Sequence, residues 1–328
     1  MARYVIFFFF VIGTAFATIT TPFEMTLATG YRQDHLKWRL QEPGDPSTTT
    51  YREDYSNLKF IQTELTLKKI TRDLYFYVNG GYGAIGSDTM RQSGFDLSFT
   101  TDPVSFQFNT DAEAFSGEGV LGYVAELTPD RYYEVNITPL FGFSIQYEKI
   151  KRKNPNPDPY ASSNISGADF FTINSTLSEQ DLKQKWYGIF IGFDFFANPR
   201  GIFNLGFGYR YHWLSLHQKF FSDLLIKTFD NDSSILLNET ITMNGKVQKN
   251  GNLGHSGYVT LGANPTRYIL LSAIGKIHYF SSKVVNANIT QQTVEISPNY
   301  SIMDTKIDRK FKSRWLFFEV LLGLSFYL

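Results

Sequence analysis

Residues Phe203–Trp213, with the sequence FNLGFGYRYHW, alternate between large apolar side chains and small or polar ones. The apolar set occupies the odd positions: Phe203, Leu205, Phe207, Tyr209, Tyr211 and Trp213. The other set occupies the even positions: Asn204, Gly206, Gly208, Arg210 and His212. Because successive side chains of a β-strand point to opposite faces, this stretch predicts a strand with one apolar and one polar face. It is longer than the five or six residues typical of soluble strands, and its large apolar face favours a barrel that meets lipid.

The same alternation recurs along the chain, in residues 133–147, 187–195, 269–279 and 316–328. In the last of these segments the apolar residues take the even positions, from Leu316 to the final residue, Leu328. A terminal alternating strand with Phe326 and Tyr327 next to its end resembles the signal that barrel-assembly machinery recognises. We therefore expect Leu316–Leu328 to bind that machinery.

Composition excludes several other classes of protein. Aromatic residues make up 17% of the chain and charged residues only 19%, which suits a barrel that faces lipid with alternate residues. The 31 Lys and Arg balance the 31 Asp and Glu, so nucleic acid is not an expected partner. There is no cysteine and no metal-binding, Walker or dinucleotide motif, so we expect no metal and no cofactor.

The first residues have the pattern of a secretory signal peptide. Arg3 supplies the positive end, an apolar run begins at Val5, and Ala15-Phe16-Ala17 forms a small-x-small cleavage site. The run is too short to span a membrane as a helix. We predict a signal peptide over residues 1–17 and an outer-membrane β-barrel over residues 18–328.

Counting the alternating segments predicts a transmembrane antiparallel up-and-down barrel of about ten strands. The expected strands are Phe23–Leu40, Leu58–Lys68, Asp73–Gly86, Gly117–Leu127, Tyr132–Glu148, Lys183–Phe196, Ile202–Leu216, His255–Ala263, Arg267–Phe280 and Arg314–Leu328. Twelve strands is the alternative, because residues 87–116 could form an additional hairpin.

Two kinds of connector alternate between these strands. Four are short and rich in turn residues: Lys69–Arg72, Thr128–Arg131, Ala197–Gly201 and Ala263–Arg267. The others are predicted as long polar loops, over residues 41–54, 87–116, 149–182, 218–254 and 281–313. The proline-rich segment Lys151–Pro159 is expected to exclude any strand. Short turns on the periplasmic side and long loops outside are typical of outer-membrane barrels.

If the apolar set faces lipid, the alternate set lines the lumen. The charged and histidine candidates for the lumen wall are Glu64, Glu134, Asp194, Arg210, His212, Lys276, His278 and Glu319. Arg210, Lys276 and Glu319 lie at similar predicted heights and could form an ion cluster. Such a cluster is either a structural plug of paired charges or a constriction that selects ions.

The ten-strand plan, and the hairpin within Tyr187–Trp213, resemble omptins, the outer-membrane proteases. That resemblance implies two aspartates near the second outer loop and an Asp-x-His element in the fourth. The nearby aspartates here are Asp88 and Asp96, which do not form a close pair, and Asp230–Ser234 contains no histidine. Without a base to activate water, we expect no protease activity.

Gly30–Leu40 (GYRQDHLKWRL) and Tyr55–Ile70 (YSNLKFIQTELTLKKI) resemble the Protochlamydia outer membrane protein family. This resemblance implies a porin-like channel for small hydrophilic solutes or ions, set among outer-membrane lipids and lipopolysaccharide. The alternatives are a surface-exposed adhesin or structural barrel acting through its long loops and, less favoured, an omptin-like protease.

Overall fold

The computed structural model describes residues 23–42, 45–85, 89–95, 104–130, 133–155, 170–173, 180–199, 203–229, 235–295 and 301–328. The predicted signal peptide over residues 1–17 lies outside this part of the chain. Among the described residues, no helix is both long and apolar enough to cross a membrane.

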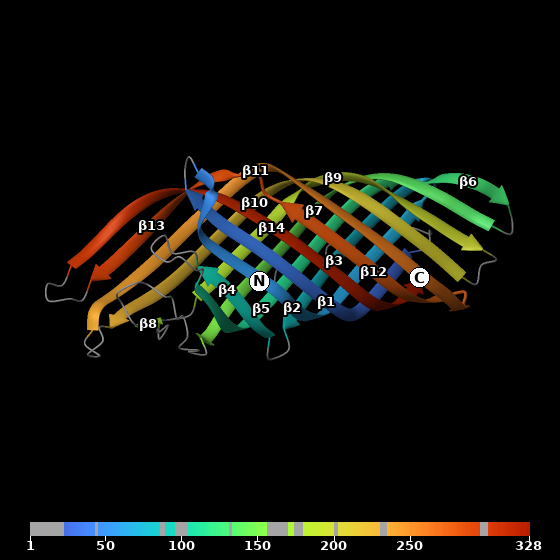
Figure 1. Ribbon diagram of the computed structural model, residues 1–328. Helices are drawn as coiled ribbons and strands as arrows, with labels where there is room; N and C mark the ends of the chain where they lie inside the picture. The colour runs from blue at the N-terminus through green and yellow to red at the C-terminus, as the bar shows by residue number, and fades with distance from the viewer. Residues whose placement is uncertain are drawn as a thin grey trace.

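Strands make up nearly all of the described chain. They are β1 (Phe23–Glu42), β2 (Asp45–Thr71), β3 (Leu74–Ile85), β4 (Thr89–Phe95), β5 (Val104–Tyr123), β6 (Ala125–Asp130), β7 (Tyr133–Pro155), β8 (Phe170–Ile173), β9 (Gln180–Pro199), β10 (Phe203–Phe229), β11 (Ile235–Thr266), β12 (Ile269–Ser281), β13 (Val285–Glu295) and β14 (Ser301–Tyr327). Antiparallel pairing runs in the order β1, β2, β3, β5, β7, β9, β10, β11, β12 and β14, and β14 pairs again with β1. The result is a closed ten-stranded barrel whose strands cross its long axis obliquely (Figure 1).

The four remaining strands extend members of this ring. β4 continues β3 between β2 and β5, and β13 continues β12 between β11 and β14. β6 continues β5 along β7, and β8 pairs with the far end of β10 ahead of β9. The hairpin within residues 87–116 thus lengthens two ring strands, so ten strands is confirmed and twelve is wrong.

The long connectors are shorter than predicted, because the strands continue far into them. Much of the expected loop 218–254 is a paired ribbon in which β10 runs to Phe229 and β11 begins at Ile235. Each strand of such a ribbon satisfies the backbone N–H and C=O groups of the other. The alternation of apolar and polar residues did not predict these extensions, because polar residues occur at both odd and even positions along them.

The expectation that Lys151–Pro159 would exclude any strand was wrong for its first half. β7 continues through Pro155, which pairs only with Phe108 of β5, whereas the pairing with β9 ends at Arg152. Proline is tolerated at a strand edge because no neighbour there needs its missing N–H. Pro139, in the middle of β7, lies between the last pairing with β5 (Gly122 with Leu140) and the first pairing with β6 (Ala125 with Ile137).

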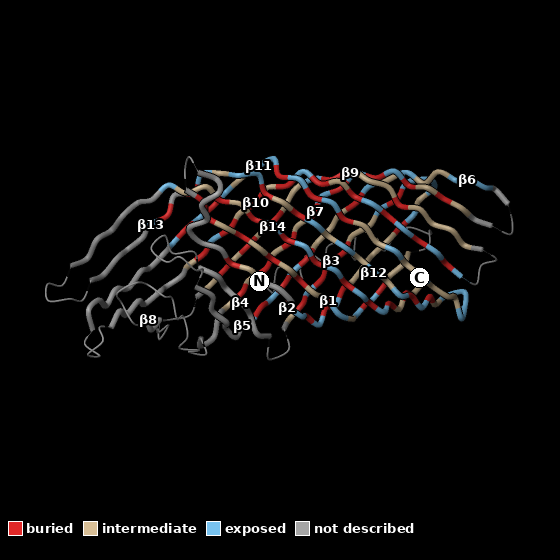
Figure 2. Tube along the Cα trace, viewed as in Figure 1, coloured by how far each residue is buried: buried red, intermediate tan, exposed pale blue. Residues whose placement is uncertain are grey.

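The outward face is apolar over a limited height. Along β10 the outward residues Phe203, Phe207 and Trp213 are 62%, 41% and 40% exposed, while the inward Arg210 and His212 are buried. Buried and exposed residues alternate in this way around the barrel (Figure 2). About ten residue steps at ~3.4 Å, tilted by ~40°, span roughly 26 Å, close to the height of a lipid-facing band.

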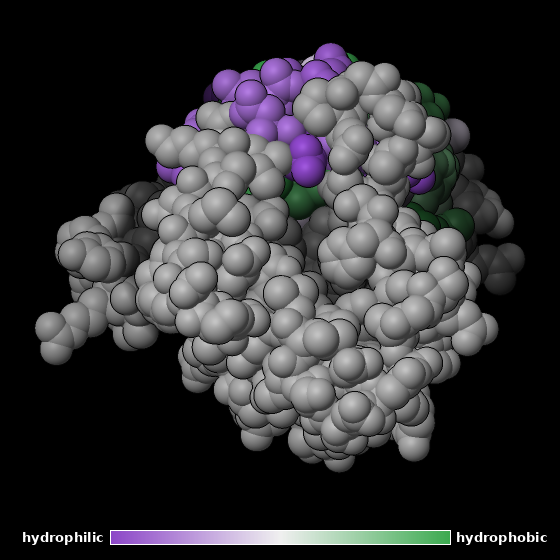
Figure 3. Space-filling model, turned by 60° about the vertical axis from the view of Figure 1, so that its left-hand side comes forward, coloured by the Kyte–Doolittle hydropathy of each residue, from purple (hydrophilic) through white to green (hydrophobic). Residues whose placement is uncertain are grey.

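Beyond Trp213 the outward face becomes polar, with Ser215, His217 and Lys219 in succession on β10. β1 shows the same change, since its outward face carries Leu27 and Tyr31 and then, further along the strand, Lys37 and Arg39. Figure 3 brings forward the end that carries β8 and β13, and the described surface at its top is largely hydrophilic. We call the apolar zone below this change the lipid belt.

The lipid belt yields a position-dependent prediction on a single strand. Phe207→Arg, at mid-height of the belt, should lower the free energy of unfolding by about 2–4 kcal/mol, because it places a charge in hydrocarbon. Ser215→Arg, on the same face beyond the belt, should change it little. Urea unfolding of both variants in phosphatidylcholine vesicles measures the difference, and equal effects at the two positions would contradict a lipid-facing belt.

Candidate functional site

The lumen is divided into two zones of different chemistry. On the side of the long hairpins, its cross-section is packed with apolar side chains that are at most 5% exposed. These side chains are Leu36, Trp38, Leu40, Tyr55, Leu58, Phe60, Ala112, Ala114, Ile150, Leu182, Trp186, Leu214, Leu216, Phe220, Val247, Phe280, Ala287, Ile289, Phe311, Trp315 and Phe317. We call this layer the aromatic band.

Ring contacts run across the aromatic band between strands that are distant in sequence. The Trp38 and Phe220 ring centroids lie 4.6 Å apart, and those of Trp186 and Phe280 lie 5.8 Å apart. Gly245 lies directly opposite Phe220, whose ring occupies the space that a Cβ at this position would need. Interdigitated packing of this kind brings described side chains from different sides of the lumen into contact with one another.

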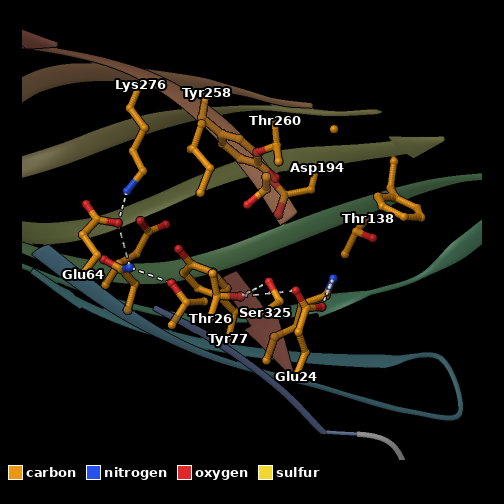
Figure 4. A pocket seen from close by; sticks show the side chains of 18 of the residues that line it. Glu24, Thr26, Glu64, Tyr77, Thr138, Asp194, Tyr258, Thr260, Lys276 and Ser325 are labelled. Atoms are coloured by element: carbon orange, nitrogen blue, oxygen red, sulfur yellow. Dashed lines mark hydrogen bonds and ion pairs between the residues drawn. The ribbon is translucent and has the colours of Figure 1, made fainter. Parts of the chain in front are cut away.

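On the side of the short turns, the lumen contains a polar cavity of about 240 Å³. Its wall runs from Glu24 and Ile70, next to the short turns, up to Glu64 and Glu118. Near the lower end, the Thr26 and Ser325 hydroxyls share a 2.6 Å hydrogen bond. Figure 4 shows these side chains projecting from several strands into one space, with Lys276 reaching Glu64 from across it. The cavity therefore lies toward the short-turn end of the barrel.

One ion cluster lies where the cavity meets the aromatic band. Arg32 donates two hydrogen bonds of 2.7 Å to Asp34, and its guanidinium stacks 4.1 Å from the Phe317 ring centroid. Glu319 lies 3.7 Å from Arg32 and 3.5 Å from Lys276, which also pairs with Glu64. This chain of alternating charges, which we call the upper cluster, links β1, β14, β12 and β2.

A second ion cluster, the lower cluster, centres on Arg210 of β10. Its guanidinium donates to Asp194 at 2.7 and 3.2 Å and to Glu118 at 3.0 Å. It also lies 4.9 Å from the Tyr258 ring centroid, and the Tyr75 hydroxyl donates to Asp194 at 3.3 Å. Buried ions need such a full set of partners, because desolvating an unpaired charge is costly.

The structure places the residues proposed from sequence as follows. Six of them line the cavity wall: Glu64, Asp194, Arg210, Lys276, His278 and Glu319. His212 is buried higher up, within hydrogen-bond distance of the Ser144 and Ser256 hydroxyls. Lys276 and Glu319 come together, whereas Arg210 joins the separate lower cluster. The side chain of Glu134 lies outside the described part.

Sequence reasoning missed Arg32, Asp34 and Glu118, and it missed the aromatic band. The signal that could have revealed the band is a change of phase in the alternation. Along β10 the large apolar residues occupy odd positions up to Trp213 and even positions from Leu214 onward. Once the outer face leaves lipid, the apolar set moves to the inside of the barrel.

The upper cluster predicts an asymmetric response to mutation. Arg32→Met should lower the free energy of unfolding by about 3–5 kcal/mol, because it leaves the fully buried Asp34 without its counter-charge. The double variant Arg32→Met/Asp34→Leu should recover a large part of this loss. Urea unfolding measures the free energy of unfolding of both variants. A double variant less stable than Arg32→Met would contradict the prediction, because the loss would then not come from the unpaired charge of Asp34.

Comparisons with known proteins place this geometry in a family. Over nearly its whole length the chain matches the outer membrane protease OmpT from Escherichia coli, with a TM-score of 0.61 at 14% identity, covering 95% of this chain and 99% of that one. The translocator domain of the autotransporter NalP from Neisseria meningitidis matches at 12% identity with a TM-score of 0.35, covering 96% of this chain and 92% of that one. A search of the curated proteins finds no match.

The OmpT match shows a shared ten-stranded fold, as the omptin-like plan in the sequence predicted, and at this identity it shows the fold alone. The family is settled by a match between residues 26–241, well over half of the chain, and the family model described as Protochlamydia outer membrane protein. The chain belongs to this family of outer-membrane β-barrel proteins.

Proposed function

We propose that the protein is a porin-like channel for small hydrophilic solutes or ions, and that the aromatic band is its closed gate. The observation that carries this proposal is the polar cavity, which is built into the lumen on the side of the short turns, the periplasmic side in this proposal. A barrel needed only as a rigid wall has no use for a water-accessible chamber lined by charged side chains. The family match, to outer membrane proteins, supports the same assignment.

The charges on the cavity wall favour cations over anions. Among the described residues that line the cavity, five carboxylates stand against three cationic side chains: Glu24, Glu64, Glu118, Asp194 and Glu319 against Lys68, Arg210 and Lys276. Rings of excess negative charge attract and pass cations in pores. The narrow chamber restricts the permeant species to small ones.

A second candidate function is a surface-acting barrel, and the aromatic band is the observation that favours it. If the band never opens, the lumen serves only as a support for the long hairpins, such as the β10–β11 ribbon beyond Trp213. An omptin-like protease has no comparable support. The residues that such an assignment would need, Asp88, Asp96 and Asp230–Ser234, lie outside the described residues.

Conductance in planar bilayers separates the two candidates. Purified wild-type protein should give discrete, small, cation-preferring steps with long closed intervals. Trp186→Ala/Phe280→Ala, which removes two facing rings of the aromatic band, should raise the open fraction and the step size. Phe207→Ala, on the lipid face of β10, is the matched control and should conduct like the wild type.

Each result bears on one candidate. A wild type that stays silent at every voltage, beside a conducting Trp186→Ala/Phe280→Ala variant, would refute the channel and support the surface-acting barrel. Because truncating two buried rings costs stability, about 3–5 kcal/mol each, folding is checked first by heat-dependent gel mobility. If the alanine variant does not fold, Trp186→Leu/Phe280→Leu takes its place.

A further inference from the structure

The outward face of the barrel carries a continuous row of lysines beyond the lipid belt. Lys149 of β7 lies directly opposite Lys183 of β9, Lys183 opposite Lys219 of β10, and Lys219 opposite Lys246 of β11. Lys219 and Lys246 are exposed, and the other two are partly exposed. We call these four residues the lysine row.

Such a row is unfavourable for the isolated barrel. Residues directly opposite each other on neighbouring strands have Cα atoms only about 4.5–5.5 Å apart, and like charges in these positions destabilise a sheet. Among the residues whose side chains are described, two acidic groups lie close by: Asp181, 3.2 Å from Lys183, and Glu113, directly opposite Lys149. They stand at one side of the row and leave Lys219 and Lys246 facing each other.

The positive charge also extends toward the membrane. Lys185 and His217 form the next outward pair below the lysine row, between it and Trp213. Burial lowers the pKa of His217, and the charges of Lys246, Lys219 and Lys185 lower it further. His217 therefore lies among an excess of positive charges, as expected where few carboxylates of the protein lie nearby.

We propose that the lysine row binds phosphate groups carried on the sugars of glycolipids in the outer leaflet. The positive charge of the row selects an anion, and its place on the outward face, beyond the lipid belt, selects a membrane lipid over a soluble ligand. The row lies six residues beyond Trp213 on β10, or about 16 Å along the barrel axis. This exceeds the roughly 5–8 Å of a simple headgroup layer, so the phosphates must be raised on a saccharide.

The inference rests on the outer-membrane setting and is independent of whether the lumen conducts. A ligand that binds only the folded state raises the midpoint of thermal unfolding, so lipid binding can be read from the Tm. Removing two lysines should change the Tm in opposite directions in the two kinds of lipid. Without phosphate it relieves repulsion, and with phosphate it removes binding groups.

The experiment compares Tm values in phosphatidylcholine vesicles with and without phosphorylated lipopolysaccharide. The wild type should gain several degrees from the lipopolysaccharide. Lys219→Gln/Lys246→Gln should be at least as stable as the wild type in phosphatidylcholine alone but should lose roughly half of the gain. Lys219→Arg/Lys246→Arg keeps the charge and should keep the gain. The matched control, Arg72→Gln/Arg267→Gln, removes two exposed charges from the short turns and should also keep it.

Two further arms identify the source of the phosphate. Lipopolysaccharide stripped of its phosphates should give no gain, and inorganic phosphate added to phosphatidylcholine vesicles should give none either. A gain of equal size from inorganic phosphate would overturn the choice of a lipid partner. A glutamine variant that is less stable than the wild type in both lipids, by the same amount, would mean that the lysines act only within the protein.

Discussion

Closure of the hydrogen-bonded ring is the constraint from which the rest of the structure follows. β14 pairs with both β12 and β1, which closes the ring. Within the lipid belt, each described ring strand therefore has a partner on both sides, and no row of unpaired backbone groups faces lipid. In hydrocarbon such unpaired groups would cost several kcal/mol each, which makes a closed barrel one of only two ways to cross a membrane. Closing ten strands also fixes a narrow interior, where every second side chain must find partners.

The interior meets this requirement in two different ways at two heights. Within the lipid belt the outer face takes the apolar residues, and the inner face satisfies its charges with one another, as Arg210 does with Asp194 and Glu118. Beyond the belt the outer face carries lysines and meets water, while Trp186 and Phe280 pack together on the inner face. The same barrel thus has a polar chamber below and an apolar band above, and the two candidate functions differ in whether that band moves.

Strand number, orientation and the inward or outward direction of each belt residue were predictable, because a period of two leaves little freedom once one face is apolar. The alternation from Phe203 to Trp213 and from Leu316 to Leu328 is of this kind, and the structure follows it. The strand extensions were not predictable from the same rule. In Lys151–Pro155 a paired ribbon carries four polar residues and one proline, a composition that the sequence alone presents as a loop.

The sequence by itself determined that this is a membrane barrel with charged residues inside, since hydrocarbon tolerates one arrangement of alternating side chains and penalises the other. Only the tertiary structure decided which charges meet. Arg32 and Glu319 lie at opposite ends of the chain and become neighbours because β1 closes the ring against β14. Likewise, the four opposed lysines come from three hairpins, and their alignment depends on strand register, which no local pattern encodes.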